Sequence, residues 1–121
     1  MTDANETILI TGGTGFAGWH LVEQLLQTKK PTQIHVTSMS PASEEMLKVL
    51  PAENFHTLDL TNKNNTEQVL TSVKPEQIYN LASIPTAAGS FEHAKDILFN
   101  NIGLQLNMLE LVKQHLPDTR V

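Results

Sequence analysis

The sequence contains no cysteine and a single arginine, at position 120. Without cysteine the chain can form no disulfide and no thiolate-bound zinc or iron–sulfur centre. Its eight lysine and arginine residues stand against thirteen aspartate and glutamate residues, for a formal net charge of −5. A nucleic-acid-binding protein needs a basic stripe that neutralises phosphates, and this composition does not supply one. We therefore expect no nucleic acid among the partners of this chain.

Long apolar runs are also missing. No run approaches the roughly 20 residues that a helix needs to cross a bilayer. Residues 1–7 are polar and acidic, which is not the pattern of a signal peptide. From these two features we expect no membrane contact and a cytoplasmic location. The 121 residues, of which 40% are hydrophobic and 17% are charged, are typical of one folded domain.

Short apolar segments alternate with segments of helical spacing. We predict strands at residues 7–11, 33–37, 54–58 and 77–81, and the start of a fifth strand at Arg120. We predict helices at residues 19–27, from Ser40 toward residue 50, from Thr61 or Asn64 to residue 73, and from Ser90 to about residue 115. This alternation predicts an α/β fold, in which helices cover both faces of a parallel sheet.

The loop after the first predicted strand, residues 11–18, reads TGGTGFAG and holds four of the six glycines. Its first glycines permit a tight turn, Gly15 lets the backbone approach a pyrophosphate, and Gly18 allows close packing of helix on strand. The N-terminus of the following helix favours an anion. This loop between strand and helix predicts a dinucleotide site, although a glycine-rich turn without a ligand is the alternative. The residues expected to contact the cofactor here are Gly12, Thr14, Gly15, Phe16, Ala17 and Gly18.

The segment TGGTGFAGWHLVEQLL, residues 11–26, resembles the opening of the extended short-chain dehydrogenase/reductase family of NAD-dependent epimerases and dehydratases. Those enzymes are nucleotide-sugar epimerases, dehydratases and reductases. The resemblance covers the whole chain but only the first part of such an enzyme. It implies a partial Rossmann-type three-layer sandwich of about four parallel strands in the order 3-2-1-4. Residues 1–121 would then be the NAD(P)-binding portion of a larger enzyme.

Two further segments match this family. In the family an aspartate followed by an apolar residue after the third strand contacts the adenine, which implies this role for Asp59 and Leu60. A carboxylate at the carboxyl end of a strand also faces the ligand crevice on physical grounds, but Asp59 could instead cap the next helix. Small residues after the family's fourth strand run along the ribose and nicotinamide side of the cofactor, which implies that role for Leu81, Ala82 and Ser83.

The finer wording of the chain points to a subgroup. Residues 76–81, EQIYNL, with Ser90 and Phe91, are closest to GDP-mannose 4,6-dehydratase and GDP-6-deoxymannose reductase. Residues 101–111 match a family helix in which the first asparagine helps to organise the active site. The match implies a supporting role for Asn101, whose alternative is an exposed helical asparagine. Leu104 and Gln105 depart from the glycine and threonine of that family pattern.

The end of the second strand leaves the choice between NAD and NADP open. An acidic residue there binds the ribose 2′-hydroxyl of NAD, and an arginine nearby accommodates the 2′-phosphate of NADP. Residues 37–40 read TSMS, with neither a carboxylate nor an arginine. The hydroxyl of Ser38 or Ser40 could serve either cofactor.

The catalytic groups of the family are missing from these 121 residues. The family uses a Tyr-x-x-x-Lys pair, in which the lysine lowers the tyrosine pKa for proton transfer. The only tyrosine is Tyr79, and Ser83 stands four residues later. The five histidines show no metal-ligand spacing, so we expect no metal site. We expect a fragment that binds NAD or NADP but is inactive alone, its intact parent acting on a nucleotide sugar. The alternative is a stand-alone, non-catalytic binding or interaction module.

The last predicted helix is expected to take part in self-association. Its apolar residues lie near one stripe, formed by Ala94, Ile97, Leu98, Ile102, Leu109, Val112 and Leu116. Because the sequence contains only the start of a fifth strand, we expect the fourth strand to have an open edge. We also expect apolar residues of this helix to lack a covering element. Such edges and patches drive association, and enzymes of the resembling family form helix-paired dimers. We therefore expect a homodimer or a larger assembly.

Overall fold

The sheet has the predicted parallel topology. The computed structural model describes residues 6–82 and 94–121. Its strands β1 (Ile8–Thr11), β2 (Ile34–Ser38), β3 (Phe55–Thr57) and β4 (Gln77–Asn80) form one sheet in the order β3-β2-β1-β4. All three strand pairings are parallel. The order 3-2-1-4 expected of a Rossmann-type fold is therefore confirmed.

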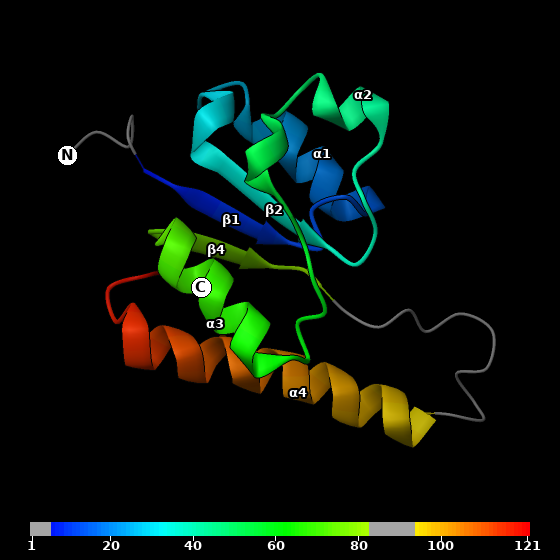
Figure 1. Cartoon of the computed structure of the whole chain (residues 1–121), viewed down its shortest axis with the longest axis vertical. Coiled ribbons are helices and arrows are strands. Elements are labelled where there is room, and N and C mark those ends of the chain that lie inside the picture. Colours follow the sequence, from blue (N-terminus) through cyan, green and yellow to red (C-terminus); the bar gives the residue numbers. More distant parts are fainter. Residues whose placement is uncertain (1–5, 83–93) are drawn as a thin grey trace.

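Helices cover both faces of this sheet (Figure 1). Helices α1 (Phe16–Leu25) and α2 (Glu44–Leu47) lie on one side, and α3 (Lys63–Val73) and α4 (Ala94–His115) lie on the other. Two short 3-10 turns, η1 (Pro31–Gln33) and η2 (Ala52–Asn54), lead into β2 and β3. None of the helices among the described residues combines the length and the hydropathy of a membrane span.

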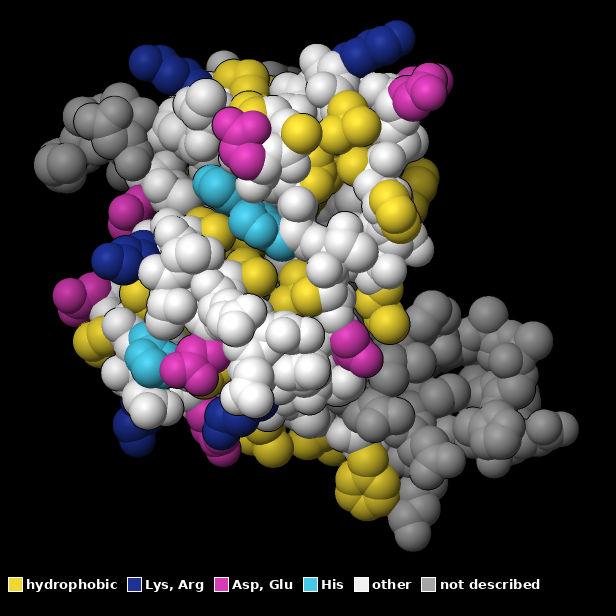
Figure 2. All heavy atoms as spheres, viewed as in Figure 1, with side chains coloured by type: hydrophobic (Ala, Val, Ile, Leu, Met, Phe, Trp, Pro, Cys, Tyr) yellow, Lys and Arg dark blue, Asp and Glu magenta, His cyan; other side chains and the backbone are white. Residues whose placement is uncertain are grey.

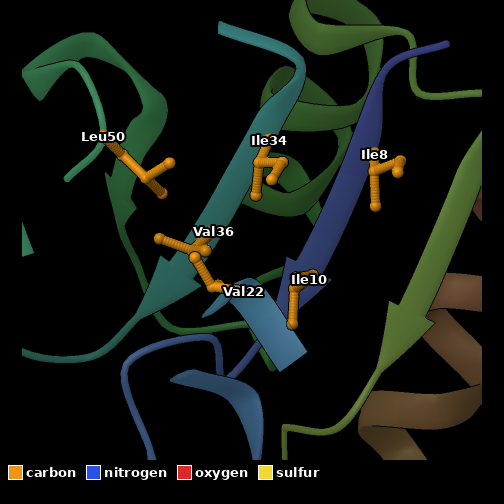
Figure 3. Close-up of a cluster of buried hydrophobic side chains, with 6 residues drawn as sticks. All are labelled: Ile8, Ile10, Val22, Ile34, Val36 and Leu50. Atoms are coloured by element: carbon orange, nitrogen blue, oxygen red, sulfur yellow. The ribbon is translucent and has the colours of Figure 1, made fainter. Parts of the chain in front are cut away.

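Each face of the sheet has its own hydrophobic core. Figure 3 shows the core beneath α1, in which alternate residues of β1 and β2 meet Val22 of α1 and Leu50. On the other face, Leu9 and Ile78 pack against Leu70 of α3 and against α4. Every residue of β1 is buried because strand residues alternate between two covered faces. The central strand is thus fixed from both sides, and so is the loop that follows it.

The start of a fifth strand is also confirmed. Arg120 forms a parallel bridge with Gln77, and its carbonyl accepts a hydrogen bond of 2.7 Å from the Ile78 amide. The Arg120 guanidinium lies 3.0 Å from Glu6 Oε1. The first residues of β4 therefore have a neighbour on the side away from β1.

The predicted start of the second helix is wrong. Ser43, not Ser40, caps α2, because the Ser43 hydroxyl accepts a hydrogen bond of 3.2 Å from the Met46 amide. The carbonyl of Ser40 instead accepts a hydrogen bond from the Ser38 hydroxyl, which belongs to the turn after β2. Glu44 and Glu45 occupy the first turn of α2, where acidic side chains favour the positive helix end. The helix is consequently shorter than the sequence indicated.

Two other helix starts differ from the prediction. Helix α3 begins at Lys63 and is capped by Asn62, whose Oδ1 accepts from the Asn65 amide at 3.1 Å, so neither Thr61 nor Asn64 opens it. Helix α1 begins at Phe16 rather than at residue 19. The glycine loop therefore passes directly into the helix.

The stripe predicted on α4 is only partly correct. The buried face consists of Leu104, Met108, Leu111 and Val112. Ile102 and Leu109, which were placed on the same stripe, are exposed. The side chains of Ala94, Ile97 and Leu98 lie outside the described residues. The helix is apolar on more than one side, so spacing alone did not identify which side meets the sheet.

A histidine pair on β2 and β3 should make stability depend on pH. His35 Nδ1 lies 3.0 Å from His56 Nε2, and the rings stack. Burial, and then the neighbouring His56, lower the pKa of His35, which Glu53 partly opposes. Burial also lowers the pKa of His56. Below the ordinary value of about 6.5, the unfolded chain therefore binds protons that the folded pair does not.

The folded state should consequently lose stability as the pH falls below about 6.5 and through the lowered pKa values of the two folded histidines. Urea unfolding at pH 7.5, 6.5 and 5.5 measures this loss. The double variant His35→Gln/His56→Gln should show a flatter pH dependence. The exposed His20, changed to Gln, serves as the control. An equal slope in the parent and the double variant would contradict this interpretation.

Candidate functional site

A cleft of about 530 Å³ lies at the carboxyl end of the sheet. This is the usual size of a small-molecule site. It opens beside the end of β1, where the chain order reverses because β2 lies on one side and β4 on the other. Ligands of open α/β sheets bind at such a switch point. The described residues that line the cleft are Gly12, Thr14, Gly15, Phe16, Ala17, Gly18, Thr37, Ser38, Met39, Leu58, Asp59, Leu60, Thr61, Leu81, Ala82 and Leu104.

Three of the loop glycines are required by the fold itself, and the first of these to consider is Gly13, where a Cβ would lie 2.5 Å from the Val36 Cβ. Gly12 has a φ of +67°, and a Cβ there would lie 3.1 Å from the Ala82 Cα. A Cβ on Gly18 would lie 2.3 Å from the carbonyl oxygen of Gly12, so α1 packs on the loop only because that atom is missing. Backbone atoms cannot yield as a flexible side chain does. These glycines bring the loop, α1 and the end of β4 together.

Gly15 has no such internal reason. A Cβ on it would meet only the Gly12 carbonyl oxygen, at an ordinary contact distance of 3.4 Å, and its φ of −75° suits any residue. Gly15 is exposed and lines the cleft. It is also the N-cap of α1, whose first turn contains no acidic residue. The free N–H groups and the positive end of α1 therefore meet the cleft at a residue without a side chain and in a turn without a carboxylate.

The end of β2 forms another wall. The buried Thr37 accepts a hydrogen bond from the Gly12 amide through its hydroxyl (3.3 Å) and one from the Gly13 amide through its carbonyl (3.1 Å). Ser38, which was predicted from the sequence, lines the cleft together with Thr37 and the exposed Met39, which were not predicted. Their position next to Ser38 in the sequence was the signal that could have predicted them. The Ser38 hydroxyl is engaged with the Ser40 carbonyl.

Asp59 lies in the cleft and does not cap α3. Its Oδ1 accepts from the Thr61 hydroxyl at 2.7 Å and from the Thr61 amide at 2.9 Å. These two bonds, the side-chain bond first, hold the pKa of Asp59 below its usual value. The carboxylate therefore remains charged and acceptor-only at neutral pH. Leu58 and Leu60 flank it in the lining, so an apolar surface lies next to a fixed acceptor.

A further wall of the cleft comes from the end of β4 and from α4. Leu81 and Ala82, for which the resemblance implies contact with the cofactor, line the cleft, and Ser83 lies outside the described residues. Leu104 of α4 is nearly buried and also lines the cleft. Sequence reasoning missed Leu104, because nothing in the helical spacing indicates that α4 reaches this point. Asn101 lies half-buried on α4 and is not among the described lining residues.

Among the described residues that line this cleft, Asp59 is the only titratable side chain. The hydroxyl of Tyr79 accepts from Gln77 Nε2 at 3.0 Å, and its ring packs against the core beneath α1. Within residues 6–82 and 94–121, no three His, Asp or Glu side chains gather closely enough to hold a metal ion. The arrangement can bind and orient a ligand that carries an anionic group and an apolar ring.

The chain matches one protein family over nearly its whole length. The model of the NAD dependent epimerase/dehydratase family covers residues 8–121. A relative from Pisum sativum, named bifunctional UDP-glucose 4-epimerase and UDP-xylose 4-epimerase 1, is 28% identical over 123 residues, which are 95% of this chain and 35% of the relative. UDP-glucuronic acid decarboxylase 6 of Arabidopsis thaliana is 36% identical over 114 residues, 92% of this chain and 31% of that protein. The chain thus spans about a third of the length of the curated relatives that it matches.

Solved structures share the fold. The UDP-glucose 4-epimerase of Thermus thermophilus, in complex with NAD, superposes with a TM-score of 0.73 at 27% identity, covering 90% of this chain and 34% of that one. The L-threonine dehydrogenase of Clostridium difficile superposes with a TM-score of 0.76 over 92% of this chain and 34% of its own. At 24% identity, the latter shows a likeness of fold alone.

Proposed function

Because the chain belongs to the NAD dependent epimerase/dehydratase family, we propose that its cleft binds NAD and that it is the cofactor-binding portion of a nucleotide-sugar-modifying enzyme. The observation that carries this proposal is Gly15. The fold does not require a glycine there, yet the missing side chain leaves the N-terminus of α1 open to the cleft. A pyrophosphate is the anion that needs such a close approach to the backbone.

The rest of the cleft fits the remaining parts of the dinucleotide. Asp59 offers a fixed acceptor for the adenine amino group, and Leu60 offers an apolar surface for the ring. Ser38 stands at the end of β2, where the adenine ribose is recognised in such folds. Leu81 and Ala82 supply the wall for the nicotinamide half, together with Ser83 as the sequence predicts. Residues 37–40 leave the choice between NAD and NADP open, and the family description together with the NAD complex of the Thermus thermophilus structure favours NAD.

We propose that the full-length protein acts on a nucleotide sugar, as an epimerase, dehydratase or reductase. The relatives described above are named for UDP-glucose, UDP-xylose and UDP-glucuronic acid. The GDP-sugar subgroup therefore remains a prediction from the wording of residues 76–81. Bound NAD supplies a hydride acceptor. The Tyr-x-x-x-Lys pair that would move the proton is not in this sequence, so the 121 residues alone should bind the cofactor without turnover.

Calorimetric titration tests the binding proposal. NAD should bind this chain weakly, because much of the nicotinamide side of the site is not in it, and NADP should bind more weakly still. Absence of heat with both cofactors at millimolar concentration would contradict the proposal. A second candidate function is a non-catalytic binding module, which is supported only by the missing Tyr-x-x-x-Lys pair. A longer reading frame that contains this pair beyond residue 121 would favour the enzyme.

We further propose that two copies of this chain pair through α4. Phe99, Ile102, Leu106 and Leu109 are 59%, 44%, 51% and 49% exposed. We call these four residues the α4 seam. Figure 2 shows hydrophobic side chains gathered along the lower edge of the molecule, where α4 lies. Their spacing of three, four and three residues is that of paired helices in coiled coils. A second copy fits this seam because it offers the same stripe on a helix of the same length.

A further inference from the structure

A chain of hydrogen bonds crosses from α4 to the wall of the cleft. The Ala82 amide donates to the Thr11 hydroxyl at 3.0 Å, and that hydroxyl donates to Asn80 Oδ1 at 2.6 Å. Asn80 Nδ2 then donates to Gln105 Oε1 at 2.8 Å. Each group gives and accepts in one consistent direction, an arrangement in which the bonds strengthen one another. This series of hydrogen bonds joins the end of β1, the end of β4 and α4.

One end of this series of hydrogen bonds lies at the cleft, and the other end lies beside it. Ala82 lines it and packs directly against Gly12, where a Cβ would be 3.1 Å from the Ala82 amide nitrogen. Gln105 follows Leu104, which lines the cleft from α4. The positions of Ala82 and Leu104 in the cleft wall therefore depend on this series of hydrogen bonds.

Apolar packing holds α4 mainly farther along the helix. Met108, Leu111 and Val112 belong to the core beneath α3 and α4, whereas Leu104 is the buried residue of α4 nearest the cleft. Gln105 itself is exposed, so its bond to Asn80 adds little to the core. Its position makes it a polar tie between α4 and the sheet beside the cleft.

We propose that Asn80 and Gln105 are positioning residues of the NAD site, an inference that rests on the proposed function. They act through Ala82 and Leu104 and need not touch the cofactor. By fixing the wall at the nicotinamide side before NAD arrives, they remove an ordering cost that would otherwise weaken binding.

The variants Gln105→Leu and Gln105→Glu separate this role from a structural one. Leucine removes the acceptor, whereas glutamate keeps an oxygen for Asn80 Nδ2. Gln105→Leu should weaken NAD binding about fivefold, the loss of one hydrogen bond, and Gln105→Glu should stay within about twofold of the parent. Asn80→Ala, which breaks both links, should weaken binding more. Gln68→Leu on the exposed face of α3 is the matched control.

Calorimetry measures the NAD dissociation constants, and hydrogen exchange measures the Ala82 amide in the chain without NAD. Exchange at Ala82 should be faster in Gln105→Leu and unchanged in Gln105→Glu and Gln68→Leu. If the parent binds NAD and Gln105→Leu binds it equally well, or if Gln105→Glu is as weak as Gln105→Leu, the inference is wrong. If the parent binds no NAD at millimolar concentration, the proposed function is contradicted instead. The exchange rates then show only whether the Asn80–Gln105 hydrogen bond holds the Ala82 amide.

Discussion

Replacing Gly15 by valine should abolish measurable NAD binding and leave the fold intact. The backbone of Gly15 is extended, and a Cβ would meet only one atom, at 3.4 Å. The cost to stability should be about 1 kcal/mol, because valine is a poor N-cap. The branched side chain would nevertheless stand where the pyrophosphate must reach the free N–H groups of α1. Hydrogen bonds to charged groups are worth about 1.5–3 kcal/mol each, so losing two of them should raise the dissociation constant at least about 100-fold.

Calorimetric titration and thermal unfolding of the same samples check this result. Gly15→Ala should fall between valine and the parent. Gly103→Val is the matched control, because a Cβ on Gly103 of α4 would meet nothing within 4 Å. Valine at Gly15 with undiminished affinity for NAD would show that the cofactor does not approach this loop. Gly18 is not a suitable substitute, since a side chain there collides with the Gly12 carbonyl and would unfold the loop together with the site.

Replacing Leu106 by glutamate should convert a dimer of this chain into a monomer. Leu106 lies in the middle of the α4 seam and is half exposed in a single copy. In a symmetric pair, each copy would bury a carboxylate against the seam of its partner, without a counter-charge on either seam. Central apolar residues commonly contribute about 2 kcal/mol or more to an interface, and a buried unpaired charge adds a further penalty. The dimer dissociation constant should therefore rise at least about 100-fold.

Light scattering at several concentrations measures this change. Gln114→Glu is the matched control, since it adds the same charge to an exposed position of α4 outside the seam. The melting temperature of Leu106→Glu at low concentration should match that of the parent, because the side chain is outside the core. If the parent chain is monomeric at high concentration, pairing through α4 is contradicted, because the α4 seam then does not bind a second copy. A dimer that survives in Leu106→Glu would place the interface elsewhere.

The two variants also test separate parts of the molecule. Gly15 belongs to the loop after β1, whereas Leu106 faces away from the sheet. Gln105, between Leu104 in the cleft and Leu106 in the seam, is the point on α4 where the two functions come closest. Loss of NAD binding in Leu106→Glu would accordingly indicate that pairing and cofactor binding are linked.

The sequence by itself determined the central part of the fold and the location of the site. The run Ile8–Thr11 is apolar and β-branched nearly throughout, as expected of a strand covered on both faces. Four glycines directly after it leave little choice but a tight passage into α1. These signals are local, because a few neighbouring residues carry the whole constraint. The place of Asp59 in the cleft agrees with the rule that parallel strands end at one edge, whereas the roles of Leu60, Leu81 and Ala82 were implied by the resemblance to the family.

Only the tertiary structure decided which residue caps α2 and which face of α4 packs on the sheet, because the local sequence was compatible with more than one answer. Ser40 and Ser43 could each cap a helix by residue type; in the fold Ser43 accepts from the Met46 amide, whereas Ser40 belongs to the turn after β2. Helix α4 is apolar on several sides, and contact with Leu9 and Ile78 selects the face that contains Met108 and Leu111. That choice turns Leu104 toward the cleft, Gln105 toward Asn80, and Leu106 toward solvent. The reason is physical: periodicity describes one helix, whereas its rotation is set by the free energy of packing against residues distant in the chain.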